Sequence, residues 1–377
     1  MKNKEIGIYI HIPFCKKKCN YCDFVSYCNK TDLIEKYIKA ILKEIELQQI
    51  NSEITTIYIG GGTPSYIDSS YIVQIINQIK KKGNIENAEI TIEVNPGTVT
   101  KEKLETYRKC GINRLSIGLQ TSNDQLLKQI GRIHNFQEFL ETYEMARSVG
   151  FTNINVDLML GLPKQRIQDL KDSLETVIKL NPEHISVYSL IVEENTPIAQ
   201  QLDEGKIELP DEDTERNMYW YVKNTLELNG YAHYEISNFS KKGFESKHNM
   251  NCWNQKEYIG FGCAAHSYKD ITRYSNTENL EEYIENIETN HIERNRTINE
   301  IQNEEDRKKE YMLLNLRKIE GVRISEFKNK FRDNPIYLYR KELDKLVKEN
   351  LIIVNEDQIK LTNKGLDLAN IVWEEFI

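Results

Sequence analysis

The stretch Tyr9-Ile-His-Ile-Pro-Phe-Cys15-Lys-Lys-Lys-Cys19-Asn-Tyr-Cys22-Asp-Phe24 decides how the rest of the chain is interpreted. Its three cysteines have the spacing C-x3-C-x2-C and follow the isoleucine-rich run 6–12. A short run of this kind predicts a strand, so the cysteines are expected on the loop at its C-terminal end. Three thiolates this close together suit a soft, thiophilic metal site.

The cysteine spacing leaves several kinds of site open. A structural zinc site normally has four ligands, and the sequence contains no second C-x2-C pair. An iron–sulfur cluster held by three cysteines instead leaves one iron free for a ligand that is not protein. A zinc knuckle or three unrelated thiols also fit the spacing, because short cysteine motifs are unspecific.

Composition narrows the class of protein. The chain has 377 residues, enough for two or three domains, and its net charge of −8 argues against a general nucleic-acid binder. No apolar run approaches the length of a membrane span, and the first residues lack the apolar segment of a secretory signal. Seven cysteines, three of them clustered, fit a reducing compartment better than a disulfide scaffold. We therefore expect a cytoplasmic protein without an integral membrane segment.

A strand followed by a helix recurs six times in the first half of the chain. The expected strands are 6–12, 54–59, 88–94, 114–119, 153–160 and 184–191, and the expected helices include 31–50, 69–82 and 101–110. This repetition predicts parallel strands with right-handed crossovers. Six strands are too few for a closed eight-stranded barrel, so we expect an α/β fold with a partial (β/α)6 barrel, whose functional face lies at the C-terminal strand ends.

The rest of the chain is expected to form two further units. Residues 201–300 predict an α+β extension to a barrel domain of residues 1–200, and the polar run 289–309 indicates a linker or an exposed helix. Residues 301–377 predict helices, a short β-hairpin and a closing helix, which together suggest a winged-helix-like domain. Such a domain contacts DNA or serves as a small interaction or lid domain. Mixed charges without a basic stripe favour the second interpretation.

Polar residues at the expected strand ends are candidates for ligand binding. The run Gly60-Gly-Gly-Thr63 offers unshielded backbone N–H groups, although it also suits a tight turn. Glu93 ends the third strand, where a solvated carboxylate is the alternative. Asp157 lies in an otherwise apolar strand, and burial there is unfavourable unless it binds a group such as ribose hydroxyls.

Four further residues have a functional and an ordinary interpretation. Gln120 ends the fourth strand. Arg132 can form a bidentate pair with a carboxylate, or it is a solvated charge at a helix end. Tyr9 and Tyr21 flank the cysteine loop, where aromatic side chains also serve simply for packing.

The cysteine motif, with an aromatic residue before its last cysteine, resembles the cluster loop of the radical S-adenosylmethionine (SAM) superfamily. The resemblance implies that Cys15, Cys19 and Cys22 hold a 4Fe–4S cluster whose open iron chelates SAM. In that superfamily an electron from the cluster cleaves the sulfonium and gives a 5′-deoxyadenosyl radical. The resemblance also implies a partial barrel.

The sequence motifs Y-x-H-I-P-F-C, C-D-F and G-G-G-T-P resemble those of one branch of that superfamily. The branch contains the oxygen-independent coproporphyrinogen III oxidases of porphyrin biosynthesis and the HemW-type heme chaperones. The resemblance implies SAM contacts at Tyr9, Tyr21, Gly61, Gly62, Thr63, Glu93, Gln120, Arg132 and Asp157. Ile191 and His266 match weaker positions of the pattern.

Two departures favour the chaperones over the oxidases. The oxidases carry a fourth cysteine as C-x-C directly after the triad, whereas Cys28 follows six residues after Cys22 here. The oxidases also have a long N-terminal arm, and only eight residues precede Tyr9. The chaperones carry an H-N-x-x-Y-W motif associated with heme; here it reads His248-Asn-Met-Asn-Cys252-Trp253, so that cysteine replaces tyrosine. His248 is the expected axial ligand, and Cys252 is a second candidate.

The resemblance therefore predicts a protein that binds heme and passes it to an acceptor protein, with a 4Fe–4S cluster and SAM as cofactors. The alternative is an oxidoreductase that decarboxylates coproporphyrinogen III through a 5′-deoxyadenosyl radical. The hypothesis of a radical SAM enzyme that acts on nucleic acid is supported by the C-terminal segment alone. No nucleic-acid partner is expected.

Overall fold

The computed structural model describes residues 4–377. The prediction that the chain has no secretory signal concerns its first residues. Of these, residues 1–3 lie outside the described residues. Within residues 4–377, no helix combines the length and the apolar character that crossing a membrane requires.

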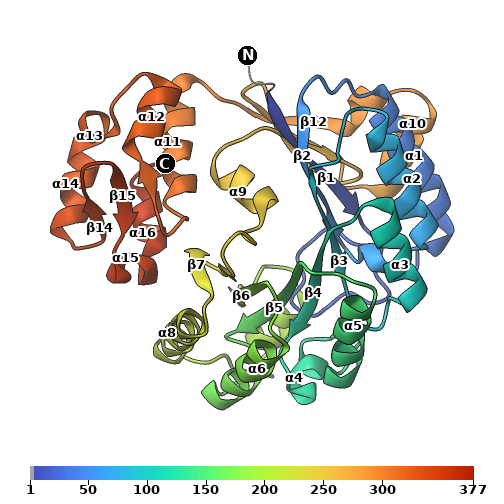
Figure 1. The fold of residues 1–377 in the computed structure, drawn as a ribbon, viewed down its shortest axis with the longest axis horizontal. Coiled ribbons are helices and arrows are strands. Elements are labelled where there is room, and N and C mark those ends of the chain that lie inside the picture. Colours follow the sequence, from blue (N-terminus) through green and yellow to red (C-terminus); the bar gives the residue numbers. More distant parts are fainter. Residues whose placement is uncertain (1–3) are drawn as a thin grey trace.

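Six parallel strands form the centre of a curved sheet, and the helices between them lie on its convex side (Figure 1). The strands are β1 (Glu5–Ile12), β2 (Glu53–Gly61), β3 (Glu89–Val94), β4 (Arg114–Gln120), β5 (Ile154–Leu160) and β6 (His184–Ser189). The helices are α1 (Ile34–Leu47), α2 (Ser69–Lys80), α3 (Lys101–Cys110), α4 (Asp124–Gln129), α5 (Phe136–Ser148) and α6 (Ile167–Leu180), with the 3-10 turns η1 (Thr31–Leu33) and η2 (Pro64–Tyr66). The strands pair in chain order, which confirms the partial (β/α)6 barrel.

Alternation along the strands separates the core from the site. Ile8 and Ile10 of β1 and Ile57 and Ile59 of β2 belong to the apolar core that the helices cover. The residues between them, such as Tyr9, face the concave side, because successive side chains of a strand point to opposite faces. The barrel interior is therefore lined by polar and aromatic side chains.

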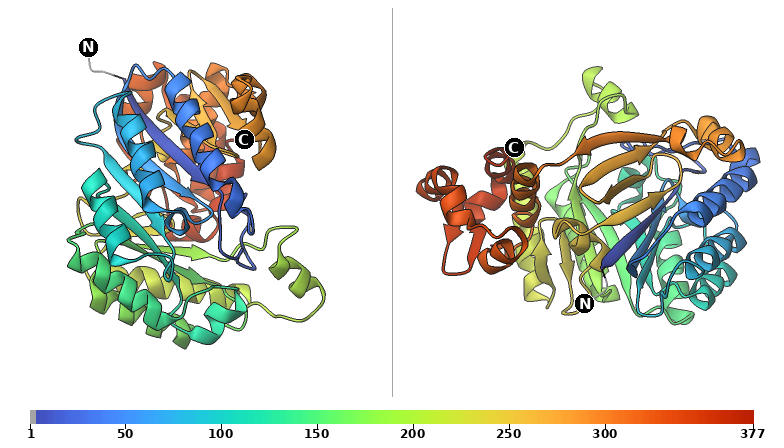
Figure 2. Two further views of the ribbon diagram at one scale, coloured as in Figure 1. Left: turned by 90° about the vertical axis from the view of Figure 1, so that its right-hand side faces the viewer. Right: turned by 90° about the horizontal axis from the view of Figure 1, so that it is seen from above.

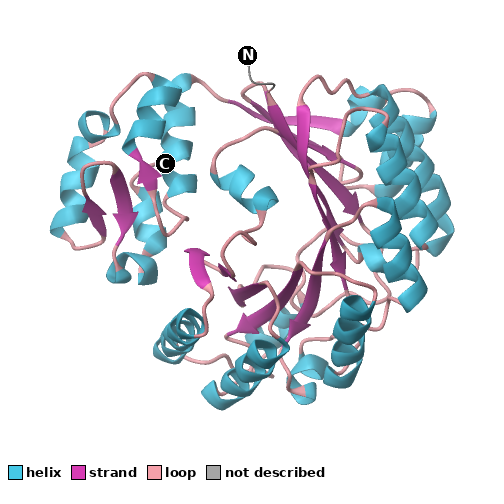
Figure 3. Cartoon of the chain, in the orientation of Figure 1, coloured by secondary structure: helices cyan, strands magenta, loops and turns pink. Residues whose placement is uncertain are grey.

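Segments that follow β6 extend the same sheet at both edges. One edge carries β8 (Asn238–Ser240) and β7 (Ala232–Glu235), after α7 (Pro197–Asp203) and α8 (Glu212–Leu228). The other carries β9 (Tyr258–Phe261), β10 (His266–Lys269), β11 (Thr272–Asn276) and β12 (Arg296–Ile301), with α10 (Leu280–Glu288) and η3 (Ile292–Asn295). Strand β9 is parallel to β1, with Gly7 opposite Tyr258. Helix α9 (Lys247–Trp253) lies on the concave side of the sheet (Figure 3).

The prediction of a linker or an exposed helix over 289–309 is wrong in part. The run contains η3 and the edge strand β12, and the exposed start of α11 follows. Strand β12 pairs with β11 through its backbone, while most of its side chains are exposed. Its composition is polar for that reason, and composition does not reveal backbone pairing.

The C-terminal segment has a separate apolar core and a three-stranded sheet in the order β13-β15-β14. Its elements are α11 (Glu304–Asn315), β13 (Val322–Arg323), α12 (Ile324–Phe331), α13 (Pro335–Leu338), α14 (Arg340–Lys348), β14 (Ile352–Val354), β15 (Gln358–Leu361), α15 (Asn363–Asp367) and α16 (Ala369–Glu374). Helices followed by a hairpin agree with the winged-helix-like prediction. The domain limits 1–200, 201–300 and 301–377 stay a prediction, since strands of the middle segment belong to the barrel sheet.

The C-terminal segment packs against α9 and the β7 edge of the sheet (Figure 2). The Arg317 guanidinium lies between two indoles, 4.7 Å from the ring centre of Trp253 and 4.6 Å from that of Trp373. The Ile236 N–H donates to the Arg317 carbonyl over 3.1 Å. Trp220 of α8 donates to Asp367 over 2.8 Å, so all three tryptophans of the chain lie at this boundary.

Candidate cofactor site

The three cysteines lie on the loop directly after β1, as the sequence predicts. The loop is held by backbone hydrogen bonds from the Cys15 N–H to the Tyr27 carbonyl (3.0 Å) and from the Asn20 N–H to the Ile130 carbonyl (2.9 Å). Burial, and then the neighbouring Cys19 thiol, raise the pKa of Cys22 to about 11. The thiols are therefore close enough to influence one another.

The geometry of the thiols bears on the kind of metal site. Across residues 4–377, no three Cys, His, Asp or Glu side chains converge closely enough to ligate one metal ion. A zinc knuckle requires such convergence. A 4Fe–4S cluster places each thiolate on a different iron, so its ligands lie further apart.

The glycine run after β2 packs directly on the cysteine loop. A Cβ at Gly62 would lie 3.0 Å from the Cys15 sulfur, and the Thr63 hydroxyl lies 3.4 Å from the same sulfur. Gly61 has a φ of +111°, and a Cβ there would lie 2.7 Å from the His11 ring. The absence of side chains therefore brings the two loops into contact.

Two carboxyl groups lie on the concave face beside this loop. Glu93 accepts a hydrogen bond from the Tyr58 hydroxyl over 2.8 Å, and Asp157 accepts from Ser116 (3.1 Å) and Asn155 (2.7 Å). Burial and the nearby Asp157 together raise the pKa of Glu93 to about 7, against the lowering effect of the Tyr58 hydrogen bond. Burial also raises the pKa of Asp157. A cationic ligand would favour the charged form of both groups.

Arg132 joins the cysteine loop to the C-terminal ends of β3 and β4. Its guanidinium donates to the Gly118 carbonyl (2.8 Å) and to Asn95, and lies 3.8 Å from the Cys19 sulfur. Its Nε is buried and has no hydrogen-bond partner among the described residues. Arg132 is therefore not a solvated charge, and its Nε–H is available to a ligand.

Three other predicted residues lie around the same strand ends. Gln120 is buried, with a φ of +72°, and its Nε2 would be 2.8 Å from a Cβ at Gly118. The Tyr9 hydroxyl lies 3.0 Å from Nδ1 of His11. Tyr21 packs against a small apolar cluster that includes Ile130. Of the weaker positions, Ile191 is exposed beyond β6, and His266 is exposed in β10 close enough to His11 to lower its pKa slightly.

Sequence reasoning missed several residues of the concave face. His11 Nε2 lies 2.8 Å from the Val25 carbonyl, so this side chain links Tyr9 to the cysteine loop. Burial lowers the pKa of His11 to about 4. Tyr58, which holds Glu93, was also missed. Polar residues at every second position of isoleucine-rich strands are the signal that indicates such a lined interior.

His248 lies at the other end of the barrel. Its Nδ1 is 2.9 Å from the Thr56 hydroxyl, its backbone N–H donates to Glu89 (3.2 Å), and its ring centre is 5.2 Å from that of Tyr58. Thr56 and Glu89 belong to the N-terminal halves of β2 and β3, whereas the cysteines follow the C-terminal end of β1. Burial lowers the pKa of His248 to about 4, so the imidazole is neutral near pH 7.

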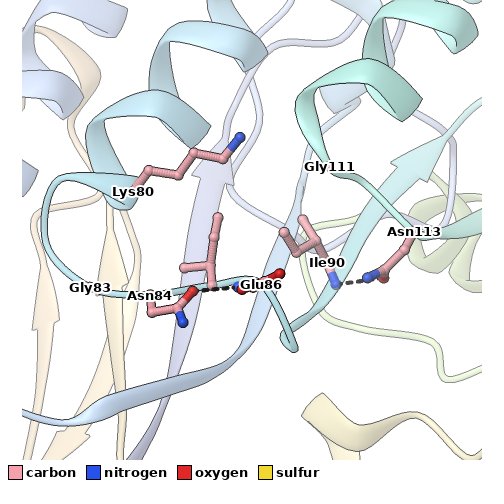
Figure 4. Close-up of a pocket in the computed structure, with 8 residues that line it drawn as sticks. Lys80, Gly83, Asn84, Glu86, Ile90, Gly111 and Asn113 are labelled. Atoms are coloured by element: carbon pink, nitrogen blue, oxygen red, sulfur yellow. Dashed lines mark hydrogen bonds between the residues drawn. The ribbon is translucent and has the colours of Figure 1, made fainter.

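A pocket of about 390 Å³ lies outside the barrel, between the loop after α2 and the turn after α3 (Figure 4). Two of its polar side chains are already paired: Asn84 accepts from the Glu86 N–H and Asn113 accepts from the Ile90 N–H. None of the predicted site residues lines it. This pocket therefore does not belong to the candidate site.

The fold and the cysteine loop define a radical SAM protein. Residues 9–177 match the family profile described as the Radical SAM superfamily, and residues 302–368 match the HemN C-terminal domain. The solved structure of coproporphyrinogen III oxidase (HemN) from Escherichia coli superposes with a TM-score of 0.86 at 23% identity, covering 100% of this chain and 90% of that one. At that identity the likeness shows the fold.

Relatives of similar length give the family. The heme chaperone HemW of Lactococcus lactis subsp. lactis (strain IL1403) is 36% identical over 100% of this chain and 98% of its own. The heme chaperone HemW of Bacillus subtilis (strain 168) is 38% identical over 98% of both chains. The chain belongs to the HemW family of radical SAM proteins. Membership in this superfamily implies a 4Fe–4S cluster and SAM.

Proposed function

We propose that this protein is a heme chaperone, which binds heme and passes it to an acceptor protein. The main support is the similarity along nearly the whole chain to proteins named heme chaperone HemW. The acceptor is expected to be a protein, and we propose a cytoplasmic location, in keeping with seven cysteines that form no disulfide in the described structure.

The cluster is assigned to Cys15, Cys19 and Cys22. The glycine contact with the Cys15 sulfur and the Arg132 contact with the Cys19 sulfur support this assignment, because both fix the thiols from the side of the barrel. When bound, the cluster and SAM supply an electron and a cleavable sulfonium.

SAM is assigned to the ends of β2 to β5. Glu93 would take the amino group, the unpartnered Nε–H of Arg132 the carboxylate, and Asp157 the ribose hydroxyls. Gly61, Gly62 and Thr63 would admit the methionine part, with Tyr9, Tyr21 and Gln120 around it. A zwitterionic ligand would give the buried Arg132 N–H a partner and would place positive charge beside the two carboxyl groups, whose pKa values are raised.

His248 is assigned as the axial ligand of heme. The Thr56 hydroxyl holds Nδ1, which leaves Nε2 as the ligand atom, and the lowered pKa keeps the ring unprotonated. Cys252 stands where the relatives' motif has tyrosine. Burial raises its pKa to about 11, so it remains a thiol near pH 7 and is the weaker candidate ligand.

The test is anaerobic cluster reconstitution followed by titration with hemin. We expect a shifted Soret band, and His248→Ala should weaken binding by about tenfold or more, whereas Cys252→Ala should change it less. His291→Ala, on a surface turn, is the matched control. A spectrum that hemin leaves unchanged, or one that His248→Ala does not alter, contradicts the proposal.

The alternative function is oxidative decarboxylation of coproporphyrinogen III. The relatives at 36–38% identity favour the chaperone, whereas the likeness to the oxidase is one of fold. An anaerobic assay with SAM and a reductant should yield no protoporphyrinogen. Product formation at a catalytic rate would reverse this preference. The third possibility is an enzyme that acts on nucleic acid. Failure of the protein to retain DNA or tRNA at moderate salt would remove it.

A further inference from the structure

Arg114 is a buried cation whose Nε has no hydrogen-bond partner among the described residues. It is the first residue of β4 and is 2% exposed, and its register neighbour on β3 is Thr91. The Arg114 Nε and the Thr91 hydroxyl are both buried without a hydrogen-bond partner, and no carboxylate within residues 4–377 forms an ion pair with Arg114. Burying a charge in this way is unfavourable unless another group pairs with it.

The side chains around Arg114 are already engaged with one another. His184 lies 2.6 Å from Asn155 and 2.7 Å from the Tyr234 hydroxyl. Asp157, whose pKa Arg114 lowers slightly, takes its hydrogen bonds from Ser116 and Asn155. The surroundings therefore offer polar contacts nearby, but in the part of the chain that the structure describes no anion is bonded to the guanidinium.

His248 belongs to the same group. After burial, the charge of Arg114 is the second cause that lowers the pKa of His248, and it also lowers the pKa of His184. The register of the sheet places Tyr58, Thr91 and Arg114 side by side on β2, β3 and β4, and the Tyr58 ring centre lies 5.2 Å from that of His248. Arg114 therefore lies near the proposed heme ligand, on the inward face of the N-terminal end of the barrel.

We infer that Arg114 binds a carboxylate of the ligand that His248 holds, which for heme is a propionate. This inference rests on the proposed function. A guanidinium presents a planar fork that matches a carboxylate, and its attraction is strong where water is excluded. Thr91 would donate its hydroxyl to the same group. The inward face thus selects a porphyrin with free carboxylates.

The carboxylate of SAM is the other anion that the site residues bind, and its place is different. Arg132, which is assigned to SAM, contacts Gly118, whereas Arg114 begins the same strand four residues earlier. Four residues of a strand span about 13 Å. Arg114→Met should therefore leave the SAM dissociation constant unchanged, and a loss of SAM affinity would overturn the assignment.

The binding test compares hemin with its dimethyl ester, in which both propionates are neutral. For the reconstituted wild-type protein we expect the ester to bind at least tenfold more weakly. Arg114→Met should weaken hemin by a similar factor and remove the difference between hemin and ester. The control is Arg147→Gln, because Arg147 pairs with Glu183 on the outside of the barrel, and it should retain that difference. Equal binding of hemin and ester to the wild type overturns this inference alone, and failure of both to bind contradicts the proposed function as well.

A stability measurement separates a binding role from a structural one. If Arg114 waits unpaired for a ligand, Arg114→Met should leave the Tm of the heme-free protein unchanged or raise it, because an unfavourable buried charge is removed. Arg147→Gln, which breaks an existing ion pair, should lower the Tm by a few degrees. A fall in Tm for Arg114→Met as large as that of the control would overturn the inference.

Discussion

The Tyr58 hydroxyl donates a hydrogen bond to Glu93 over 2.8 Å. The ring of the same tyrosine packs near His248, with 5.2 Å between the two ring centres. One side chain therefore touches both the proposed SAM carboxylate partner and the proposed heme ligand. A change in the charge of Glu93 can therefore alter the position of Tyr58 and, through it, the surroundings of His248 at the opposite end of the barrel.

The first prediction concerns the pH dependence of stability. Burial raises the pKa of Glu93 from 4.5 to about 7, so the folded protein binds a proton that the unfolded chain has released between these values. This contribution stabilises the fold at low pH and is lost as pH rises toward 7. Glu93→Gln, which stays neutral, should be more stable relative to the wild type at pH 8 than at pH 5, as measured by urea unfolding without SAM.

The matched control for that series is Glu102→Gln, at an exposed position of α3. Its stability should follow the wild type at both pH values. If Glu93→Gln shows the same difference from the wild type at pH 5 and pH 8, the carboxyl group does not titrate in this range.

The second prediction concerns the contact between Gly62 and Cys15. A methyl group at residue 62 would lie 3.0 Å from the Cys15 sulfur and 3.1 Å from backbone atoms of the cysteine loop, so it must displace them. Gly62→Ala should therefore retain clearly less iron than the wild type after anaerobic reconstitution, measured as iron per chain. Gly83→Ala, where the nearest atom is the flexible end of Ile54, should retain the wild-type amount.

The third prediction concerns the fork of Arg132. Lysine keeps the charge but cannot hold the Gly118 carbonyl and Asn95 while it also offers a free N–H. Arg132→Lys should weaken SAM binding by about tenfold, equal to about 1.4 kcal/mol, in equilibrium dialysis. Lys128→Ala, on the neighbouring helix α4, is the control. An unchanged SAM affinity would show that Arg132 only supports the loop.

The fourth prediction concerns the docking of the C-terminal segment. The Arg317 guanidinium is held between Trp253 and Trp373, and a desolvated contact of this kind contributes about 2 kcal/mol. Arg317→Met should loosen the segment, shift the tryptophan emission to longer wavelength and speed proteolysis between the barrel and residue 304. Arg323→Met, which removes a surface ion pair with Glu320, should change neither. An unaltered emission spectrum for Arg317→Met would mean that the stack does not hold the segment.

Local patterns predicted much of the fold. Helix α3 begins and ends at the predicted residues, because apolar spacing within one helix is local information. Strand β12 was missed, since its exposed polar side chains resemble a linker. The extension of the barrel sheet at both edges also depends on pairing between distant segments.

The candidate site divides in the same way. Glu93 and Asp157 could be predicted because each carboxyl group ends or interrupts an apolar strand. The role of Tyr58 could not, since its contact with Glu93 spans 35 residues and depends on the register of two strands. Arg114 was missed because a single arginine in a sequence carries no sign that its partner is lacking.

The position of β1 has a consequence for synthesis on the ribosome. The first strand lies between β2 and β9, and β9 is supplied by residues 258–261. Most of the polypeptide must therefore be translated before both sides of β1 are occupied. Until then a nascent chain carries the cysteine loop beside an open backbone edge, which other strands can join. The strand that carries the cysteine loop therefore has neighbours on both sides only after residues 258–261 have been translated.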